Sequence, residues 1–452
     1  MPAVTKAPHL RPNTMHHGHV VALSDGEGAL ALIDGVEVRV VGGVPGDEGE
    51  FLISHVGQHQ TWGVLHSLEK ASPDRVVAPC PLVLQCGGCP WQMVALSAQQ
   101  LAREVQIRAL IGELTADANW RLWPHAQLAT GYRTRALMMA RKHRGPLRLG
   151  FFRPGSHDLV SPDACDTQHP LVNDVLEKAR QILDRPEISV WKDADHPGLL
   201  RAVLYRVDPQ IGEGLLTMVV NRRVRFEDIS EALMQIEGVS GVFANINPAA
   251  GGAALGPETV HLAGAEIQRI QFGELTLEVG PTSFLQTRHD LAQTLIEVVG
   301  SLLPSKIHHL ADLYAGVGVF GLAHRARCEQ VTLVERDGAA ANDARVNLAN
   351  LNAFHVKVLE TDAASFAASM GDRAIDAVIV DPPRSGCAAA VLDGLATLVP
   401  GSRVVYVSCG PNSLARDIKV LVSQGYCATD VVLIDMFPHT PHAEVVVGLT
   451  KN

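Results

Sequence analysis

The sequence Asp312-Leu-Tyr-Ala-Gly316-Val-Gly318-Val-Phe-Gly321 closes an apolar run that begins at Ile307 and has the composition of a buried strand. Its glycines permit a tight turn and let the backbone approach a ligand, and the helix expected after the turn presents free N–H groups. The next apolar run ends at Glu335, where a carboxylate can accept hydrogen bonds from ribose hydroxyls. This pattern predicts a nucleotide-binding unit of strand, turn and helix, and it fits NAD and S-adenosylmethionine equally well.

Apolar strands alternate with helical segments from about residue 275 onward. The predicted strands are 307–313, 330–334, 374–380, 402–407, 428–434 and 443–449. Such alternation is typical of a doubly wound parallel sheet, so residues 273–452 are predicted to form an α/β, Rossmann-like domain. Ligands of these sheets bind beyond the carboxyl ends of the strands.

Short runs of alternating apolar and polar residues, separated by glycine-rich turns, fill residues 14–69. The predicted strands are 19–22, 29–33, 36–41, 50–56 and 61–68. So many short strands in so few residues predict a small β-barrel of the oligonucleotide-binding kind over residues 10–72. Residues 73–272, which mix strand and helix patterns, are predicted to form a central α+β domain.

The chain has 452 residues, of which 47% are hydrophobic and 19% are charged, and its net charge is −10. This balance is that of a globular, multidomain protein and excludes the disordered, collagenous and coiled-coil classes. No apolar run reaches the ~20 residues that a membrane span requires, and residues 1–11 lack a secretory signal. We therefore expect a cytoplasmic protein that has no membrane partner.

Basic residues are concentrated between residues 101 and 160, which contain ten Arg or Lys and four Asp or Glu. No acid interrupts the run formed by Arg133, Arg135, Arg141, Lys142, Arg144, Arg148 and Arg153. A confined basic face on an acidic protein suits contacts with nucleic-acid phosphates. A solvated surface explains the same charge equally well.

Further motifs stand at the predicted strand ends of the C-terminal domain. Asp381-Pro-Pro-Arg384 follows one strand, and its prolines hold a rigid turn over the ligand crevice. A polar residue followed by Pro-Pro is typical of methyltransferases that act on planar nitrogen or base substrates, and it favours S-adenosylmethionine over NAD. Cys409 ends the next strand as a candidate nucleophile, and Glu444, just before the last strand, is expected to bring a carboxylate near the same edge. The nearby His442 is expected to be a structural histidine.

The eight cysteines point to metal ligation or catalysis, because structural disulfides are rare in cytosolic proteins. Cys80, Cys86 and Cys89 share one short segment that contains glycines, and Cys165 is available downstream as a fourth ligand. Four thiolates with this spacing predict an iron–sulfur cubane. A zinc site with four cysteine ligands is the alternative.

Taken in order, these motifs resemble the RNA uracil-5 methyltransferase family, in particular its bacterial branch that acts on 23S ribosomal RNA. The resemblance covers nearly the whole chain. It includes a TRAM-type barrel ending near Ser72-Pro-Asp-Arg75, the cysteines, Tyr132-Arg133-Thr-Arg135, Phe284-Leu-Gln286 and the C-terminal motifs. Two positions depart from the family pattern, because Gly410 and Arg288 stand where the family usually has Asn.

The resemblance implies an S-adenosylmethionine-dependent enzyme that methylates carbon 5 of a uridine, with Cys409 as nucleophile and Glu444 as base. Implied cofactor contacts are Gln286, Tyr314, Gly316, Gly318, Glu335, Asp362 and Asp381. Expected substrate contacts are Asp381, Arg133 and Arg135. Cys80, Cys86, Cys89 and Cys165 are then the ligands of a [4Fe–4S] cluster.

Carbon 5 of uracil is a poor nucleophile, so addition of the Cys409 thiolate at carbon 6 must come first. The thiol is therefore expected to be at least partly ionised. Glu444 then removes the proton from carbon 5 before the thiolate leaves. The target base must leave its stack, so the expected partner is a loop or bulge of RNA with a flipped uridine, bound by a monomer.

Three alternatives stay open at this point. Transfer RNA is the alternative substrate within the family. An NAD-dependent iron–sulfur oxidoreductase explains the glycines and cysteines but leaves Asp381-Pro-Pro, Cys409 and Glu444 without a role. An RNA-binding or assembly factor with an inactive methyltransferase fold is disfavoured because both Cys409 and Glu444 are present.

Overall fold

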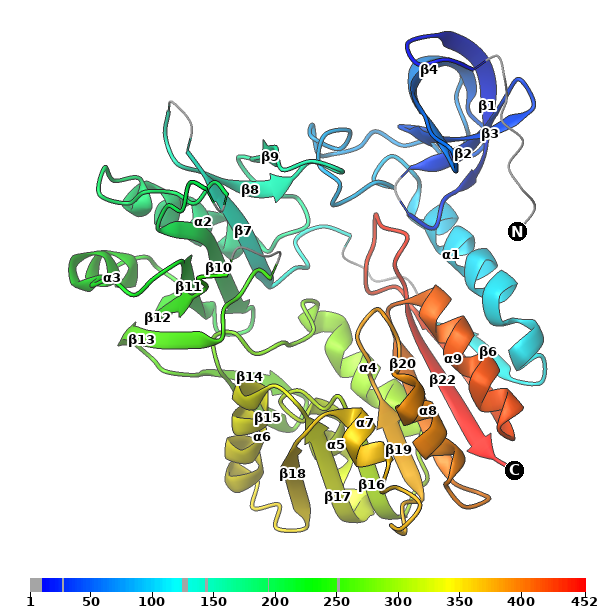
Figure 1. Ribbon diagram of the computed structural model, residues 1–452, viewed down its shortest axis with the longest axis vertical. Coiled ribbons are helices and arrows are strands. Elements are labelled where there is room, and N and C mark those ends of the chain that lie inside the picture. Colours follow the sequence, from blue (N-terminus) through cyan, green and yellow to red (C-terminus); the bar gives the residue numbers. More distant parts are fainter. Residues whose placement is uncertain (1–9, 27, 124–128, 143–144, 194, 250–252) are drawn as a thin grey trace. The chain divides into compact units, whose positions relative to one another are not determined.

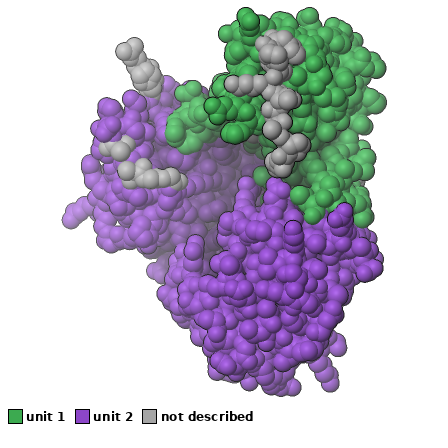
Figure 2. Space-filling model, turned by 45° about the vertical axis from the view of Figure 1, so that its right-hand side comes forward, with its two compact units in different colours: residues 1–110, 152–160, 435–443 green, residues 111–151, 161–434, 444–452 purple. Residues whose placement is uncertain are grey.

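The computed structural model describes residues 10–452 except 27, 124–128, 143–144, 194 and 250–252. The chain forms two compact units, each assembled from segments that are distant in the sequence (Figure 1, Figure 2). The first unit comprises residues 1–110, 152–160 and 435–443, and the second comprises residues 111–151, 161–434 and 444–452. The three contiguous domains expected from the sequence therefore do not coincide with these units.

The first unit contains a closed barrel with the strand order β1-β2-β3-β5-β4. Its strands are β1 (Met15–Leu23), β2 (Ala29–Ile33), β3 (Val36–Val41), β4 (Glu48–Val56) and β5 (Thr61–Lys70). Alternate residues point inwards, as with Ala29, Ala31 and Ile33 of β2, which are fully buried. The small N-terminal barrel predicted from the alternating sequence is confirmed, and its closure leaves no unpaired sheet edge.

The first unit also contains nearly all of helix α1 (Leu96–Ile111). This helix is followed by a 3-10 turn, η1 (Glu113–Thr115). The guanidinium of Arg103, which is buried in α1, donates hydrogen bonds of 2.7 Å to Asp435 Oδ2 and to Thr440 O. These bonds attach the 435–443 segment to the helix. The first unit also includes the short strand β9 (Leu159–Val160).

One sheet of the second unit has strands in the order β13-β12-β11-β10-β7-β8. They are β7 (Arg135–Arg141), β8 (Arg148–Phe152), β10 (Leu200–Asp208), β11 (Glu213–Val220), β12 (Val239–Ile246) and β13 (Glu258–Gly264). Helices α2 (Pro170–Leu183) and α3 (Glu227–Met234) bury apolar side chains such as Leu176 and Leu233 in the core shared with this sheet.

The second sheet of this unit has the order β18-β17-β16-β19-β20-β22-β21-β6. Its strands are β6 (Asn119–Leu122), β16 (Ile307–Leu313), β17 (Cys328–Glu335), β18 (Val356–Glu360), β19 (Ala377–Val380), β20 (Arg403–Ser408), β21 (Tyr426–Ile434) and β22 (Glu444–Lys451). The connecting helices are α4 (His289–Leu302), α5 (Val319–His324), α6 (Gly338–Asn350), α7 (Ala363–Ala367), α8 (Ala389–Ala396) and α9 (Pro411–Ser423) (Figure 1). The 3-10 turn η2 (Arg325–Arg327) follows α5, and the hairpin of β14 (Gln268–Phe272) and β15 (Leu275–Val279) precedes α4. The Rossmann-like α/β architecture is confirmed.

This sheet differs from the expected one in three places. β22 runs antiparallel to β20 and β21, so the sheet is not entirely parallel. β18 is absent from the predicted strands because it lies at the sheet edge and its partly exposed residues form no continuous apolar run. β6 comes from the region assigned to the central domain, yet it pairs with β21 from Asn119 to Leu122, a distant pairing that no local pattern reveals. None of the described helices is long and apolar enough to cross a membrane.

Candidate active site

Three neighbouring strands bring chemically active side chains to one edge of the C-terminal sheet. β20 lies between β19 and β22, and Cys409 directly follows β20 as Asp381 directly follows β19. Because β22 is antiparallel, its first residue, Glu444, lies at the edge where β20 ends. Ser408 pairs with Val445, so Cys409 and Glu444 occupy the next position in the same register. The structure therefore brings together the residues predicted as nucleophile and base.

The Cys409 thiol is half-buried and is held in its protonated form. Burial, and next the neighbouring Glu444, raise the pKa of Cys409 to about 11, and Asp381 adds to the rise. Arg384 acts in the opposite direction through its charge and a side-chain hydrogen bond with the thiol. Burial and two carboxyls therefore oppose ionisation of the thiol more strongly than one guanidinium favours it, and the partly ionised thiol that the reaction requires stays a prediction.

The two carboxyls of this edge also retain protons more readily than exposed acids. Burial raises the pKa of Asp381 to about 7. Glu444 is 2% exposed, and burial together with the charge of Asp381 raises its pKa well above the usual value, against a lowering effect of Arg384. A carboxyl with a pKa of about 7, such as that of Asp381, can exchange protons near neutral pH, as general acid–base chemistry requires.

A buried hydrogen-bond network holds the turn that contains Arg384. Asp417 Oδ2 accepts a bond of 2.8 Å from the Cys387 N–H and one of 2.6 Å from the Tyr406 hydroxyl. The Ser413 hydroxyl donates to the carbonyl oxygen of Arg384 at 2.8 Å. The sequence shows Arg384 within a motif but gives it no role. Its charge beside two carboxyls becomes visible only when β19, β20 and β22 are assembled.

The turn after β16 has the geometry of a ligand cradle. The Gly316 N–H donates a hydrogen bond of 2.9 Å to Glu335 Oε2, which joins the turn to the end of β17. Gly316 has φ +56°, and a Cβ added there would meet no atom within 4 Å. Gly318, with φ +89°, directly precedes α5, and Tyr314 also has a positive φ of +62°. At Gly316 the backbone of this turn thus faces space that a ligand can occupy.

Asp312 is a buried carboxyl to which the sequence assigns no function. Its Oδ2 accepts a hydrogen bond of 2.8 Å from the Gly321 N–H across the turn. Burial raises the pKa of Asp312 to about 7, and the charges of Asp381 and Glu335 add to this effect. Asp312 therefore fixes the glycine turn through this hydrogen bond. The free-energy cost of burying its ionised carboxylate depends on pH.

The two remaining predicted cofactor contacts lie in loops of the second unit. Asp362 is exposed and caps α7, accepting bonds from the Ser365 N–H at 2.9 Å and the Ser365 hydroxyl at 2.6 Å, and these bonds lower its pKa. Gln286 is half-buried and precedes Thr287, whose carbonyl accepts a bond of 2.9 Å from the Thr134 N–H. Their contacts with a cofactor stay predictions.

The basic run does not form one exposed face. Arg141 is half-buried and donates to the Ala140 carbonyl at 2.8 Å, and Lys142 forms an ion pair of 2.7 Å with Asp184. Arg133 and Arg135 are half-buried, whereas Arg148 and Arg153 are exposed on different units. Arg144 lies outside the described residues. Arg135 and Arg141 share one partly buried face of β7, whereas Arg148 belongs to β8 and Arg153 to the first unit, so a run of charges in sequence is divided in space.

The cysteines predicted to hold a cluster are divided between the units. Cys80, Cys86 and Cys89 are half-buried in turns of the first unit, where the Cys86 N–H donates to Leu82 O at 2.8 Å. Cys165 belongs to the second unit. In the described part of the chain, no group of three or more His, Cys, Asp or Glu side chains is arranged to hold a metal ion. The cluster stays a prediction.

Comparison with known proteins identifies the family. A family model described as tRNA (uracil-5-)-methyltransferase matches residues 265–452. An uncharacterized RNA methyltransferase of Gloeobacter violaceus is 31% identical, with 98% of this chain and 99% of the relative covered. A second, from Nostoc sp., is 31% identical, with 97% and 98% covered. This chain belongs to the RNA uracil-5 methyltransferase family.

This RNA uracil-5 methyltransferase also shares its fold with a solved structure. The tRNA (uracil-54, C5)-methyltransferase of Pyrococcus abyssi, crystallised with S-adenosyl-L-homocysteine, matches with a TM-score of 0.79 and 24% identity. The match covers 96% of this chain and 99% of the archaeal one. The expected S-adenosylmethionine-dependent RNA uracil-5 methyltransferase is therefore confirmed, and family membership excludes the NAD-dependent oxidoreductase.

Proposed function

We propose that this RNA uracil-5 methyltransferase forms a covalent bond between Cys409 and the target uracil while it methylates carbon 5. The observation that carries the proposal is the register of β20 and β22, which gives Cys409 and Glu444 adjacent positions at one sheet edge. A nucleophile and a base so placed suit a reaction that adds sulfur at carbon 6 and removes a proton from carbon 5.

The turn after β16 is the proposed cofactor site. S-adenosylmethionine, when bound, supplies a methyl group on a positively charged sulfur. The open space at Gly316 and the Glu335 carboxylate fixed by the Gly316 N–H suit a nucleoside whose ribose hydroxyls donate hydrogen bonds. The further proposed contacts are Gln286, Tyr314, Gly318, Asp362 and Asp381.

In the first proposed step, the Cys409 sulfur forms a bond to carbon 6, and an electron pair of the C5–C6 double bond moves toward the ring carbonyl oxygen. The thiol proton passes to Asp381, which is partly ionised at neutral pH because its pKa is about 7. Arg384, through its hydrogen bond with the thiol, favours the thiolate. The protonated Asp381 is then able to donate a hydrogen bond to the ring carbonyl oxygen.

Before the second proposed step, the electron pair that moved toward the ring oxygen would return to carbon 5 and form its bond to the methyl group, and the broken methyl–sulfur bond would leave its electron pair on the sulfur of the cofactor. Carbon 5 must then lose its proton. Glu444 takes this proton, the electron pair of the C5–H bond restores the C5–C6 double bond, and the bond from carbon 6 to sulfur breaks. The raised pKa of Glu444 makes its ionised form a strong base. Arg384 lowers the pKa of Glu444 and so favours the ionised form that this step needs.

The proposed substrate is a looped or bulged RNA segment whose uridine has left the stack. Arg133, which precedes β7, and Arg135, its first residue, are the proposed contacts for the flanking phosphates. The Nε atom of Arg135 is buried and makes no hydrogen bond within the described residues, so this donor lacks an acceptor. The N-terminal barrel is proposed to add a TRAM-type RNA-binding surface.

Ribosomal 23S RNA is the proposed substrate, which places the enzyme in the cytoplasm. Transfer RNA is the second candidate, because the structurally similar Pyrococcus abyssi enzyme methylates uracil 54 of tRNA. Mass mapping of 5-methyluridine in 23S RNA and tRNA from a deletion strain and its parent distinguishes the two. Loss of a methyl group from 23S RNA supports the proposal, loss from tRNA selects the second candidate, and unchanged maps contradict both.

A [4Fe–4S] cluster bound by Cys80, Cys86, Cys89 and Cys165 is also proposed. The support is chemical, because three half-buried thiols lie within a ten-residue loop and thiolates are the usual ligands of such clusters. The proposed role is structural, since methyl transfer to uracil involves no change of redox state.

A further inference from the structure

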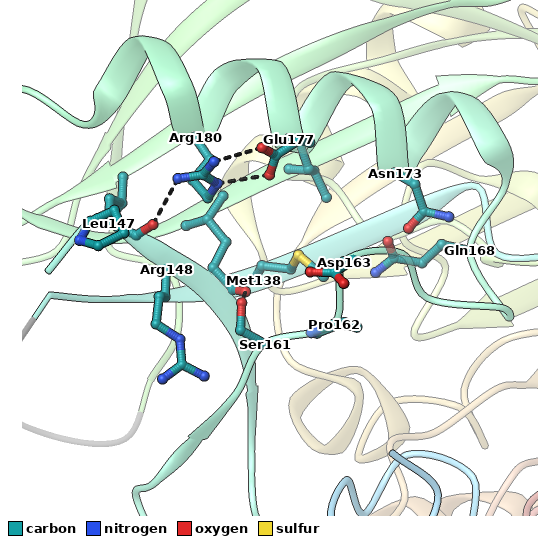
Figure 3. A pocket seen from close by; sticks show the side chains of 13 residues that line it. Met138, Leu147, Arg148, Ser161, Pro162, Asp163, Gln168, Asn173, Glu177 and Arg180 are labelled. Carbon is teal, nitrogen blue, oxygen red and sulfur yellow. Dashed lines mark hydrogen bonds and ion pairs between the residues drawn. The ribbon is translucent and has the colours of Figure 1, made fainter. Parts of the chain in front are cut away.

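A cavity of about 450 Å³ lies in the second unit, and its lining contains neither Cys409 nor Glu444 (Figure 3). It is lined by β7, β8, α2 and the segment 161–168. Its apolar wall consists of Met138, Leu147, Leu149 and Leu176. Figure 3 shows the polar ends of Asp163, Gln168 and Asn173 gathered at one end of the cavity, with Arg148 toward the other.

The polar end of this cavity contains an unsatisfied acceptor. Gln168 is 3% exposed, and its side-chain carbonyl oxygen has no hydrogen-bond partner among the described residues. Asp163, which is exposed, contributes a carboxylate to the same lining. By contrast, Glu177 already accepts a bond of 2.6 Å from Arg180. A buried acceptor without a donor is costly, so the site favours a ligand that brings N–H groups.

We propose that this cavity binds an unpaired guanine of the RNA substrate, an inference that rests on the proposed function. The faces of a purine ring suit the apolar wall, and single-stranded RNA is read through such splayed bases. The Watson–Crick edge of guanine carries adjacent N1–H and N2–H donors for Gln168 and Asp163, whereas uracil offers one N–H. The exposed guanidinium of Arg148 suits the attached phosphate.

Backbone hydrogen bonds connect this cavity with the proposed catalytic region. The segment that contains Gln168 runs beside Arg133. The Arg133 N–H donates to Thr167 O at 2.8 Å, and the Arg133 carbonyl accepts from the His169 N–H at 2.9 Å. The next residue, Thr134, donates through its N–H to Thr287 O at 2.9 Å, in the loop that contains a proposed cofactor contact. A guanine held here would therefore belong to the same RNA segment that the proposed phosphate contacts bind.

The test is a titration of the full-length protein with guanosine and uridine 5′-monophosphates, followed by saturation-transfer NMR. The variants are Gln168→Leu, which removes the buried carbonyl at similar size, and Asp163→Asn, which changes an exposed carboxylate. Asp228→Asn, at the exposed beginning of α3, is the matched control. The proposal predicts that guanosine monophosphate binds more tightly than the uridine compound, and that each cavity variant binds it about tenfold more weakly. The control should bind it as the wild type does.

Equal affinity for the two nucleotides, or unchanged guanosine monophosphate binding in both cavity variants, overturns the proposal. Asp163→Asn keeps the test decisive if Gln168→Leu fails to fold. The titration involves no methyl transfer, so its result is independent of the proposed covalent reaction. Conversely, a protein that methylates uridine but shows no guanine preference retains the proposed function and loses this site.

Discussion

Cys409 and Glu444 occupy adjacent positions in the register of β20 and β22, and the carboxyl of Glu444 raises the pKa of the Cys409 thiol. The relationship depends on the direction of β22. Because the last strand is antiparallel, its first residue lies at the edge where the parallel strands end. Ligands of such sheets bind at this edge.

Replacing Cys409 with Ala is expected to abolish methyl transfer, because no other group at this edge can form the bond to carbon 6 in the proposed mechanism. Binding of S-adenosylmethionine, measured by calorimetry, should be retained. Cys427→Ala, at an exposed position of β21, serves as the control and should remain active. Full turnover by Cys409→Ala would remove the covalent mechanism.

Replacing Glu444 with Gln is expected to trap the enzyme on its RNA. The amide cannot take the proton from carbon 5, so the bond between carbon 6 and sulfur should persist after methylation. A slowly migrating protein–RNA band on a denaturing gel measures this adduct. Glu329→Gln, an exposed change on β17, should give no such band. Continued turnover without an adduct would show that another group is the base.

Alkylation of Cys409 by iodoacetamide should be slow at pH 7 and should increase about tenfold per pH unit toward pH 11, because the pKa of the thiol is about 11. Arg384→Met should slow the reaction further, since Arg384 lowers this pKa and its loss reduces the thiolate fraction. Mass spectrometry of the Cys409 peptide between pH 7 and 9 measures the rates. Arg222→Met, an exposed change in the central sheet region, is the control. Rapid, pH-independent alkylation would contradict the buried, protonated thiol.

The contribution of Asp312 to the free energy of unfolding should fall as the pH rises from about 4 to 7. Its pKa is about 7 in the folded chain and is ordinarily 3.8, so the unfolded chain ionises first and is favoured within this window. One such group contributes a slope of at most ~1.4 kcal/mol per pH unit. Asp312→Asn should reduce the slope measured by urea unfolding, and the exposed change Asp393→Asn should not. Equal slopes in all three proteins would contradict the buried state of this carboxyl.

Anaerobically purified protein should be brown and should contain iron and acid-labile sulfide in equal amounts, as a [4Fe–4S] cluster requires. Cys89→Ser should reduce the iron content, whereas Cys427→Ser should not change it. A colourless protein that contains zinc instead would select the zinc alternative.

Local patterns in the sequence were sufficient to predict many of the strands of this protein. Alternation with a period of two predicts the barrel strands, and apolar runs followed by Gly316, Asp381 and Cys409 predict the strand ends of the C-terminal sheet, because these patterns reflect burial of adjacent residues. Edge strands are harder to predict from the sequence, since β18 and β6 bury too few side chains to produce an apolar run.

The tertiary structure decided the ionisation states of the site residues and which of these residues lie close together. The sequence alone determined which residue types are present: a cysteine, two carboxyls and a guanidinium near strand ends. Their common edge depends on the antiparallel direction of β22, which contradicts the expected all-parallel sheet. The protonated thiol depends on burial and on charges contributed by β19 and β22, and a pKa responds to such neighbours in space, wherever they stand in the chain.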